Sequence, residues 1–316
     1  MRKAREQVLA TSGGKGIAPA RTEIGQPPLN AQAHLEILIQ AVIPGTSIFS
    51  LSTVETSATC SSTASTSGRG LRVKLGDETR VLASGLCGAG GNVHEQTDGV
   101  FEMAESLLQQ AGLAFTDVVR TWIHLRDIDR DYNVLNRARR AFFVSRGIQP
   151  APASTAIGGD PVSEIHSLCL GFYAVKGRSP VERIPMTSPI LNEAPEYGAD
   201  FVRGMRVVES NKSMLIVSGT ASIDEAGKTA HVGDICAQTD RMLVNLHVLL
   251  RGQGATFDDI TFAITYVKRP SDQLLLLDRF RNAGFEGFPH VWVQADICRP
   301  ELLCETELIA VLPCIQ

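Results

Sequence analysis

The sequence contains an internal repeat, and this repeat constrains the fold more strongly than any other feature. Four residues of the first half recur in the second half at a constant spacing of 142 positions. Several matches at a single offset are hard to obtain by chance, so we interpret the chain as two copies of one structural unit. The matching pairs are Gln96 and Gln238, Leu108 and Leu250, Phe115 and Phe257, and Asp117 and Asp259.

Each copy has the same predicted order of strands and helices. In the first copy an apolar strand at 80–86 precedes a helix at about 96–111, whose apolar residues recur with the 3.6-residue period. Gly112 is placed to end this helix. The sequence therefore predicts an α+β fold with two tandem domains, each a mixed β-sheet with helices packed on one face. The remaining predicted elements of the first copy are a β-rich stretch at 115–125, a helix at 132–146 and a strand pair from 152 to 175.

The first 70 residues do not share this pattern. Residues 1–50 lack a long periodic stretch, and residues 52–70 consist largely of Ser and Thr. Such composition favours irregular structure, so residues 1–70 are expected to form an irregular N-terminal arm that could still join the first domain. The predicted domains are then residues 71–178 and 179–316.

The composition argues against several classes of function. Lys and Arg number 30 against 34 Asp and Glu, so the net charge of −4 gives no global reason to bind nucleic acid or an anionic membrane. No apolar run approaches the roughly 18–20 residues of a membrane-spanning helix, and the N-terminus lacks the apolar core of a secretory signal. The seven cysteines are scattered without a CxxC pair, as are the seven histidines. We therefore expect a cytoplasmic protein with reduced thiols, no metal site and no cofactor.

The closing strands of the two copies differ in charge, and this difference points to a site in the second copy. The second copy carries Arg299 and then Glu305 and Glu307, whereas the first copy lacks these groups at the matching positions. Strand alternation places both carboxylates on one face, among apolar neighbours. Desolvation raises the pKa of such a carboxyl group, which suits a proton donor. An ion-paired structural Glu and a solvated surface Arg remain the alternative interpretations.

The repeated unit resembles the Rid superfamily, the YjgF-like proteins. The resemblance rests on Gln, a Leu-Leu pair, Gly and Phe-x-Asp, as found at 238–259, and on a closing Arg followed by a Glu-x-Glu strand at 299–307. It implies a chorismate-mutase-like α+β fold and, commonly, a trimer with sites at domain or subunit contacts. Many of these proteins act on reactive enamines or imines, and some carry an endoribonuclease label. Two tandem copies are unusual among them.

A more specific resemblance is to the chorismatase family, two-domain Rid relatives that hydrolyse chorismate. It runs from roughly residue 70 to 315, and the short spacing between Arg299 and Glu305 favours this family over the Rid deaminases. The first 70 residues match nothing that can be placed. The most specific stretches are 118–125 with 136–143, 152–159, 188–198, 217–223 and 298–305.

This resemblance implies roles for individual residues. Glu305 matches the catalytic glutamate of the family, which protonates the enolpyruvyl group of chorismate, and Cys298 is a second catalytic candidate because members with a pocket cysteine form hydroxybenzoate. Arg299 and Arg203 are the candidate clamps for the two substrate carboxylates, with Tyr197 as a further substrate contact. The residues expected at the pocket floor are Ser218, Gly219, Thr220 and Ala221.

The arginines of the 132–146 helix receive no role from the sequence. They are expected to form a basic face in contact with solvent, because most surface arginines do. The residues concerned are Arg137, Arg139, Arg140 and Arg146.

Three functions stay open at this point. The first is hydrolysis of chorismate to pyruvate and a dihydroxycyclohexadienoate or hydroxybenzoate. The second is a Rid-type imine or enamine deaminase, or another small-carboxylate enzyme, which needs one cation for its substrate. The third is a non-catalytic or RNA-related binding protein, which the acidic charge balance disfavours. The expected partner is a small dicarboxylate, with neither nucleic acid nor membrane, and the assembly a homotrimer or a monomer with pseudo-oligomeric domain packing.

Overall fold

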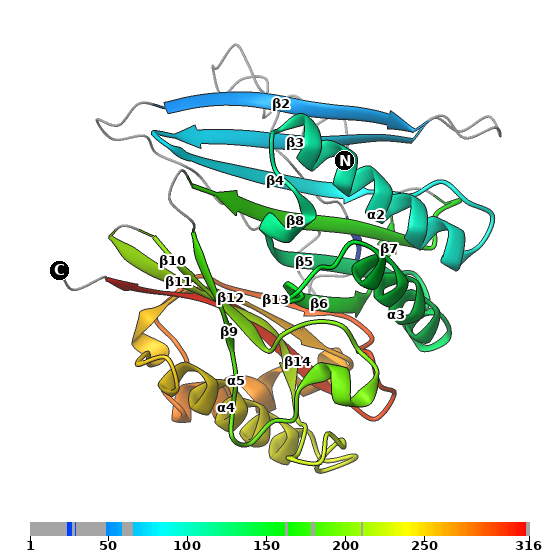
Figure 1. Ribbon diagram of the computed structural model, residues 1–316. Helices are drawn as coiled ribbons and strands as arrows, with labels where there is room; N and C mark the ends of the chain where they lie inside the picture. Colours follow the sequence, from blue (N-terminus) through cyan, green and yellow to red (C-terminus); the bar gives the residue numbers. More distant parts are fainter. Residues whose placement is uncertain are drawn as a thin grey trace, which may run out of the picture.

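The computed structural model describes residues 24–26, 29, 49–58, 66–161, 164–177, 181–209 and 211–313. Two six-stranded sheets dominate this part of the chain, each accompanied by two α-helices (Figure 1). The strand orders are β2-β3-β4-β8-β5-β6 and β9-β10-β11-β14-β12-β13. The two orders are the same when the strands of each sheet are numbered along the chain, with the two-residue strands β1 and β7 left out because they form a separate pair. The predicted α+β fold with two tandem domains is confirmed.

The first domain combines antiparallel and parallel pairing, with β5 and β6 parallel and the other neighbours of its large sheet antiparallel. A two-residue strand β1 (Ile24–Gly25) pairs with β7 (Asp160–Pro161). The other elements are β2 (Phe49–Ala58), β3 (Thr66–Leu75), β4 (Glu78–Leu86), α2 (Val93–Gln110), the 3-10 turn η1 (Phe115–Asp117), β5 (Val118–Leu125), α3 (Ile128–Ser145), β6 (Ala153–Gly158) and β8 (Leu168–Lys176).

The second domain repeats this plan, with β12 and β13 as its parallel pair. Its elements are β9 (Glu182–Met186), η2 (Ala194–Tyr197), β10 (Gly204–Val208), β11 (Lys212–Ala221), α4 (Ile235–Arg251), η3 (Phe257–Asp259), β12 (Ile260–Val267), η4 (Pro270–Asp272), α5 (Gln273–Asn282), β13 (His290–Gln294) and β14 (Cys304–Pro313).

The residues that revealed the repeat make the same contacts in both domains. The side-chain amide of Gln96 accepts a hydrogen bond from the backbone N–H of Ser167 at 2.7 Å, and Gln238 accepts one from Leu303 at 2.9 Å. Each Gln thereby connects the first turn of its helix to the start of the closing strand. Gly112 follows the first helix with a φ of 80°, a left-handed conformation that favours glycine, as the sequence predicted.

The Ser- and Thr-rich stretch is not irregular where the structure describes it, so the expectation of irregular structure is wrong for residues 52–58 and 66–70. β2 and β3 pair in register from Phe49 with Leu75 to Ala58 with Thr66. The composition misled because strand pairing is made by the backbone, and β-branched Thr favours it. β2 lies at the edge of the sheet, where polar side chains are tolerated. The expectation for the rest of the N-terminal arm concerns residues outside those that the structure describes, namely 1–23, 27–28, 30–48 and 59–65.

The two faces of each sheet have different neighbours. In β8, Phe172 and Ala174 belong to the core beneath α2 and α3, whereas Tyr173 and Val175 pack against strands of the second domain. The second domain contributes residues of β10, β11, β12 and β14 to this shared cluster. The helix-free faces of the two sheets therefore meet each other. A buried ion pair between Arg80 and Glu209, 3.0 Å long, also joins the domains.

None of the described helices combines the length and hydrophobicity needed to cross a bilayer. Within the same residues, no three potential metal ligands come together.

Candidate active site

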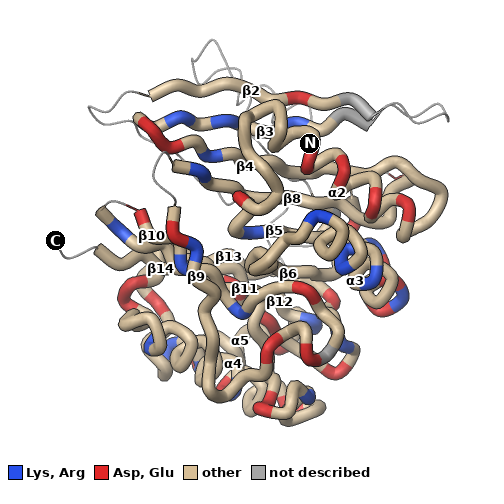
Figure 2. The backbone as a smooth tube through the Cα atoms, in the orientation of Figure 1, with Lys and Arg blue, Asp and Glu red and all other residues tan. Residues whose placement is uncertain are grey.

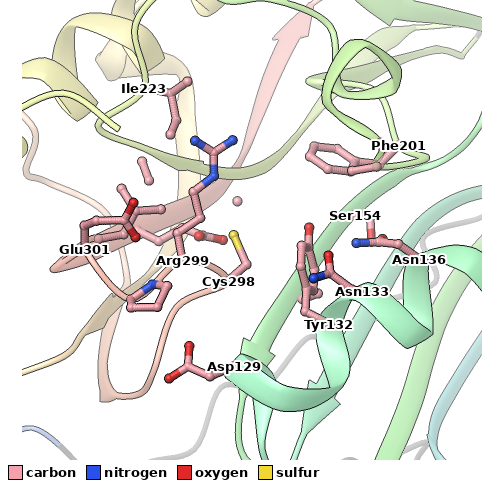
Figure 3. Close-up of a pocket in the computed structure, with 18 of the residues that line it drawn as sticks. Asp129, Tyr132, Asn133, Asn136, Ser154, Phe201, Ile223, Cys298, Arg299 and Glu301 are labelled. Carbon is pink, nitrogen blue, oxygen red and sulfur yellow. The ribbon is translucent and has the colours of Figure 1, made fainter. Parts of the chain in front are cut away.

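A cavity of about 470 Å³ lies between the two domains. The first domain supplies α3 and β6 to its wall, and the second supplies the segment before β10, strand β11, and the β13–β14 connection with the start of β14. In Figure 3, Tyr132 and Asn136 on α3 face Cys298 and Arg299 of the second domain. The site is therefore built by both domains, although the sequence placed it in the second copy.

Glu305 is the acidic group at the inner end of this cavity. Its side chain is on β14 and is 4% exposed. Burial and, to a lesser extent, the nearby Glu307 raise the pKa of Glu305 to about 8, although Arg120 and Arg203 oppose the shift. A Cβ on Gly219 would lie 1.8 Å from Oε1 of Glu305, so glycine is required where β11 passes this carboxyl group. Glu305 can therefore hold a proton near neutral pH.

Glu307, two residues further along the same strand, has a different environment. Arg120 on β5 of the first domain donates to its Oε2 at 2.7 Å, and Trp122 donates to its Oε1 at 2.7 Å. Arg120 also donates to the hydroxyl of Thr155, which accepts a further hydrogen bond from the backbone N–H of Gly219 at 2.9 Å. The alternative interpretation of an ion-paired structural glutamate thus applies to Glu307 and not to Glu305.

Three arginines line the cavity. Arg203 is held by the backbone carbonyl of Asn192, to which its Nε donates at 2.8 Å. Arg299 donates from Nη1 to the carbonyl of Gly227 at 2.8 Å. Arg139, on α3, is 1% exposed and donates to Asn136 at 2.6 Å. These contacts hold each guanidinium group in place, so three cations line the same cavity as the protonatable carboxyl group of Glu305.

Comparison with known proteins agrees with this architecture. A family model described as Endoribonuclease L-PSP matches residues 78–165. A crystal structure of a chorismatase superposes with a TM-score of 0.61 at 22% identity, covering 76% of this chain and 77% of that one. The 3-hydroxybenzoate synthase of Streptomyces hygroscopicus is 26% identical, with 69% of each chain aligned. The chain thus resembles a chorismatase in its two-domain, Rid-like fold.

A shorter match is also found. The 3-aminoacrylate deaminase RutC of Acinetobacter baylyi is 27% identical over 99 residues, which is 31% of the chorismatase-like chain and 79% of the deaminase. This match has the length of one domain, in keeping with the duplication of a Rid-like unit.

The cavity of the chorismatase-like protein brings together six of the nine residues proposed from the sequence. These are Glu305, Cys298, Arg299, Arg203, Gly219 and Ala221. Ser218 and Thr220, in contrast, are not among the lining residues. Ser218 donates to the carbonyl of Val202 at 2.6 Å and accepts from the N–H of Ser154, so it links the domains. Thr220 donates to the carbonyl of Ser218.

The expectation for Tyr197 cannot be compared with the structure. Its backbone ends η2, directly before Gly198 and Ala199, which line the cavity. Its side chain lies outside the described part of the chain.

Cys298 is a neutral thiol in this environment. Burial raises its pKa to about 12, and the neighbouring Glu305 adds to the rise, while Arg299 and a hydrogen bond with Tyr132 oppose it. A thiolate is the nucleophilic form of cysteine. The group is therefore suited to packing or hydrogen bonding at neutral pH, and not to nucleophilic attack.

Arg139 is the main cavity residue that the sequence analysis misplaced. It was expected on a solvated helix face, but it is buried and lines the cavity. A signal was present: Leu135, Arg139 and Phe142 have the i, i+4, i+7 spacing of one helix stripe, and all three are buried. An arginine within an apolar stripe indicates a buried cation with a partner.

Proposed function

We propose that the protein hydrolyses chorismate and releases pyruvate. Glu305 is the general acid in this proposal, and Arg299 and Arg203 bind the two carboxylates of the substrate. The observation that carries the proposal is a buried glutamate with a pKa of about 8 in a cavity lined by three arginines. The similarity to 3-hydroxybenzoate synthase supports the same substrate class.

The chemistry requires a proton donor and a dicarboxylate site. Glu305 donates its proton to the methylene carbon of the enolpyruvyl group, which becomes a methyl group and leaves an oxocarbenium ion. Water adds to this cation and returns a proton to the Glu305 carboxylate. The resulting hemiketal then breaks its bond to the ring oxygen, and its hydroxyl proton is transferred to that oxygen as the carbonyl of pyruvate forms. The products are pyruvate and a dihydroxycyclohexadienoate. Protonation at carbon is slow, so a positioned acid in a water-poor cavity is the expected source of the rate.

The arginines contribute substrate orientation and charge compensation. A guanidinium group can bind a carboxylate through two parallel hydrogen bonds. Arg299 and Arg203 belong to the second domain, whereas Arg139 reaches the cavity from the first. Two of them match the two carboxylates of chorismate, and the third balances the negative charge of the bound substrate. A monocarboxylate would leave more of this positive charge uncompensated.

Cys298 takes a secondary role in the proposal. Because the thiol stays neutral, it contributes shape and a weak hydrogen-bond donor beside the ring and does not form a covalent intermediate. Its influence falls on the ring product, a dihydrodiol or a hydroxybenzoate, and not on pyruvate release.

The deciding experiment is incubation of the purified protein with chorismate while pyruvate is followed by a coupled lactate dehydrogenase assay. Pyruvate should accumulate without added metal or cofactor. In deuterated water, one deuterium should enter the methyl group of pyruvate, because that carbon receives the proton from the exchangeable Glu305 carboxyl. The proposal is contradicted if no pyruvate forms under conditions in which a chorismatase, used as the positive control, releases it.

A second candidate is hydrolysis of a small enamine or imine, which the similarity to 3-aminoacrylate deaminase favours. Such a substrate has one carboxylate, so it would use one arginine of the cavity. Ammonia release from 2-aminoacrylate or an imino acid, together with a lack of pyruvate from chorismate, would select this alternative.

A further inference from the structure

Two buried carboxyl groups share one arginine at the base of the cavity. Glu305 and Glu307 lie on the same face of β14, and both are almost completely buried. Arg120 makes its ion pair with Glu307, and the indole N–H of Trp122 occupies the other oxygen of the same carboxylate. Both carboxyl oxygens of Glu307 thus accept a hydrogen bond from a donor of the first domain, and the one from Arg120 comes from a cation.

We propose that Glu307 is a positioning residue, whose ion pair with Arg120 of the first domain makes it the ionised member of the pair and thereby keeps Glu305 protonated. The inference rests on the proposed function, because it assigns the origin of the acid form of Glu305. It adds a role for the first domain, since Arg120 and Trp122, which donate to Glu307, are on β5.

The charged and titratable groups around Glu305 come from four elements. On its own strand, Glu307 is the like charge that disfavours ionisation of Glu305. On β12, Tyr266 pairs with Glu305 in the sheet, and burial keeps this phenol neutral by raising its pKa. Arg120 on β5 and Arg203 before β10 favour the ionised form but are each held by another acceptor.

Further titratable and charged groups line the same cavity, namely Cys298, Arg299, Arg139, Tyr132, Asp129 and Glu301. Cys298 is a neutral thiol, because burial raises its pKa to about 12. Arg299 lines the same cavity and is anchored to Gly227. β11 presents Gly219 and Ala221 here, which carry no charge. Of the carboxyl groups in the described residues, Glu307 is the one that raises the pKa of Glu305 against the nearby arginines.

The sign of the effect follows from these positions. If Glu307 loses its charge, Glu305 loses a negative neighbour, and Arg120 is left without its anionic partner. Both changes favour ionised Glu305, so its pKa must fall. An arginine at close range, once it is no longer neutralised by another carboxylate, lowers the pKa of a carboxyl group by about 1–3 units. Because Glu305 acts in its protonated form, activity would then be lost at a lower pH.

The test compares pH profiles of kcat/KM for chorismate in wild type, Glu307→Gln and Glu209→Gln. The wild-type rate should fall on the alkaline side near pH 8, the value given by the pKa of Glu305. In Glu307→Gln this limb should move down by about 1–3 units, with activity recovering toward acidic pH. Glu209→Gln removes a carboxylate from another buried interdomain ion pair, with Arg80, and should leave the limb in place.

A merely structural role for Glu307 would lower activity equally at all pH values, and an unmoved limb in Glu307→Gln would overturn the inference. Glu307→Asp, which keeps the charge, should retain most of the wild-type profile. A shifted limb in Glu209→Gln would also count against the inference, since it would attribute the effect to domain packing.

A second measurement needs neither a substitution of Glu307 nor turnover. Carbon-13 NMR of glutamate carboxyl groups in the wild-type protein, with Glu305 assigned from Glu305→Gln, should find Glu305 protonated and Glu307 ionised at pH 7. The reverse assignment, or two ionised groups, would overturn the inference. If pyruvate is never released from chorismate, the proposed function fails, and this titration still decides the protonation of the pair.

Discussion

The two domains share one backbone plan but carry different side chains on the faces that meet. In the first domain, Cys169 lies opposite His124 across the β5–β8 ladder. At the equivalent place in the second domain, Glu305 lies opposite Tyr266 across the β12–β14 ladder. One copy thus has a thiol where the other has the acid. A duplicated unit can keep its fold while a single face diverges in chemistry.

Some of the side chains that differ between the two domains contact each other across the interface. Arg120 and Trp122 of β5 correspond to Phe262 and Ile264 of β12, so these two donors to Glu307 have no counterpart at the matching positions of the second domain. Basic positions on α3 are visible in Figure 2, and Arg139 is the one that enters the cavity. The first domain supplies Arg120 and Arg139, and the second supplies Glu305 with Arg203 and Arg299, so neither domain has the whole site by itself.

The largest expected effect on activity distinguishes Glu305 from Cys169, its equivalent in the first domain. Glu305→Gln keeps the shape of the side chain but removes the transferable proton, so kcat should fall by about 10²–10⁴-fold while substrate binding survives. Cys169→Ser changes the equivalent residue of the first domain and should leave kcat unchanged. Stopped-assay measurement of pyruvate release decides this. Full activity in Glu305→Gln would refute its role and make Glu307 the next candidate acid.

The next effect concerns the cations of the second domain. Arg299→Ala should weaken binding by about 2–5 kcal/mol, because a buried substrate carboxylate would lose its charged partner. Arg203→Ala should weaken dicarboxylate ligands more than monocarboxylates. Calorimetry with a stable chorismate analogue and with its monocarboxylate counterpart measures both. Equal affinity in the wild type and both variants would rule out the two-clamp arrangement.

The sequence allowed prediction of the features that each domain determines locally. The constant spacing of Gln96 and Gln238 revealed the duplication, and strand alternation correctly placed Glu305 and Glu307 on one face. The lack of matching groups in the first copy then singled out the second copy. These inferences needed the chemistry of one strand or one helix and no knowledge of how the domains dock.

The missed features depend on contacts between the domains. Arg120 is a single basic residue in a buried strand, and its partner Glu307 follows 187 positions later in the chain. Ser218 and Thr220 were expected at the pocket floor, but their hydroxyl groups bond to backbone carbonyls instead. The local sequence does not reveal these contacts, because the docking of the two sheets determines which side chains face the cavity.

A smaller effect should distinguish two neighbouring arginines of α3. Arg139→Gln removes the cation that the first domain adds to the cavity and should weaken binding of the analogue by about 1–3 kcal/mol. Arg140→Gln is the matched control, because Arg140 is exposed and pairs with Asp200 outside the cavity. A surface change of this kind should stay within about 0.5 kcal/mol. Equal affinities for the two variants would restrict substrate recognition to the second domain.

The smallest effect is expected at Cys298, the thiol that lies within the cavity. Its pKa of about 12 leaves almost no thiolate below pH 9, so a nucleophilic role is not expected. Cys298→Ser should therefore change pyruvate release by about threefold or less, since the acid Glu305 and the arginines are retained. Chromatography of the ring products should show the larger change, in the ratio of dihydrodiol to hydroxybenzoate. A loss of pyruvate release as deep as that of Glu305→Gln would place the thiol in the first chemical step, because an effect confined to the ring product cannot slow enol ether cleavage.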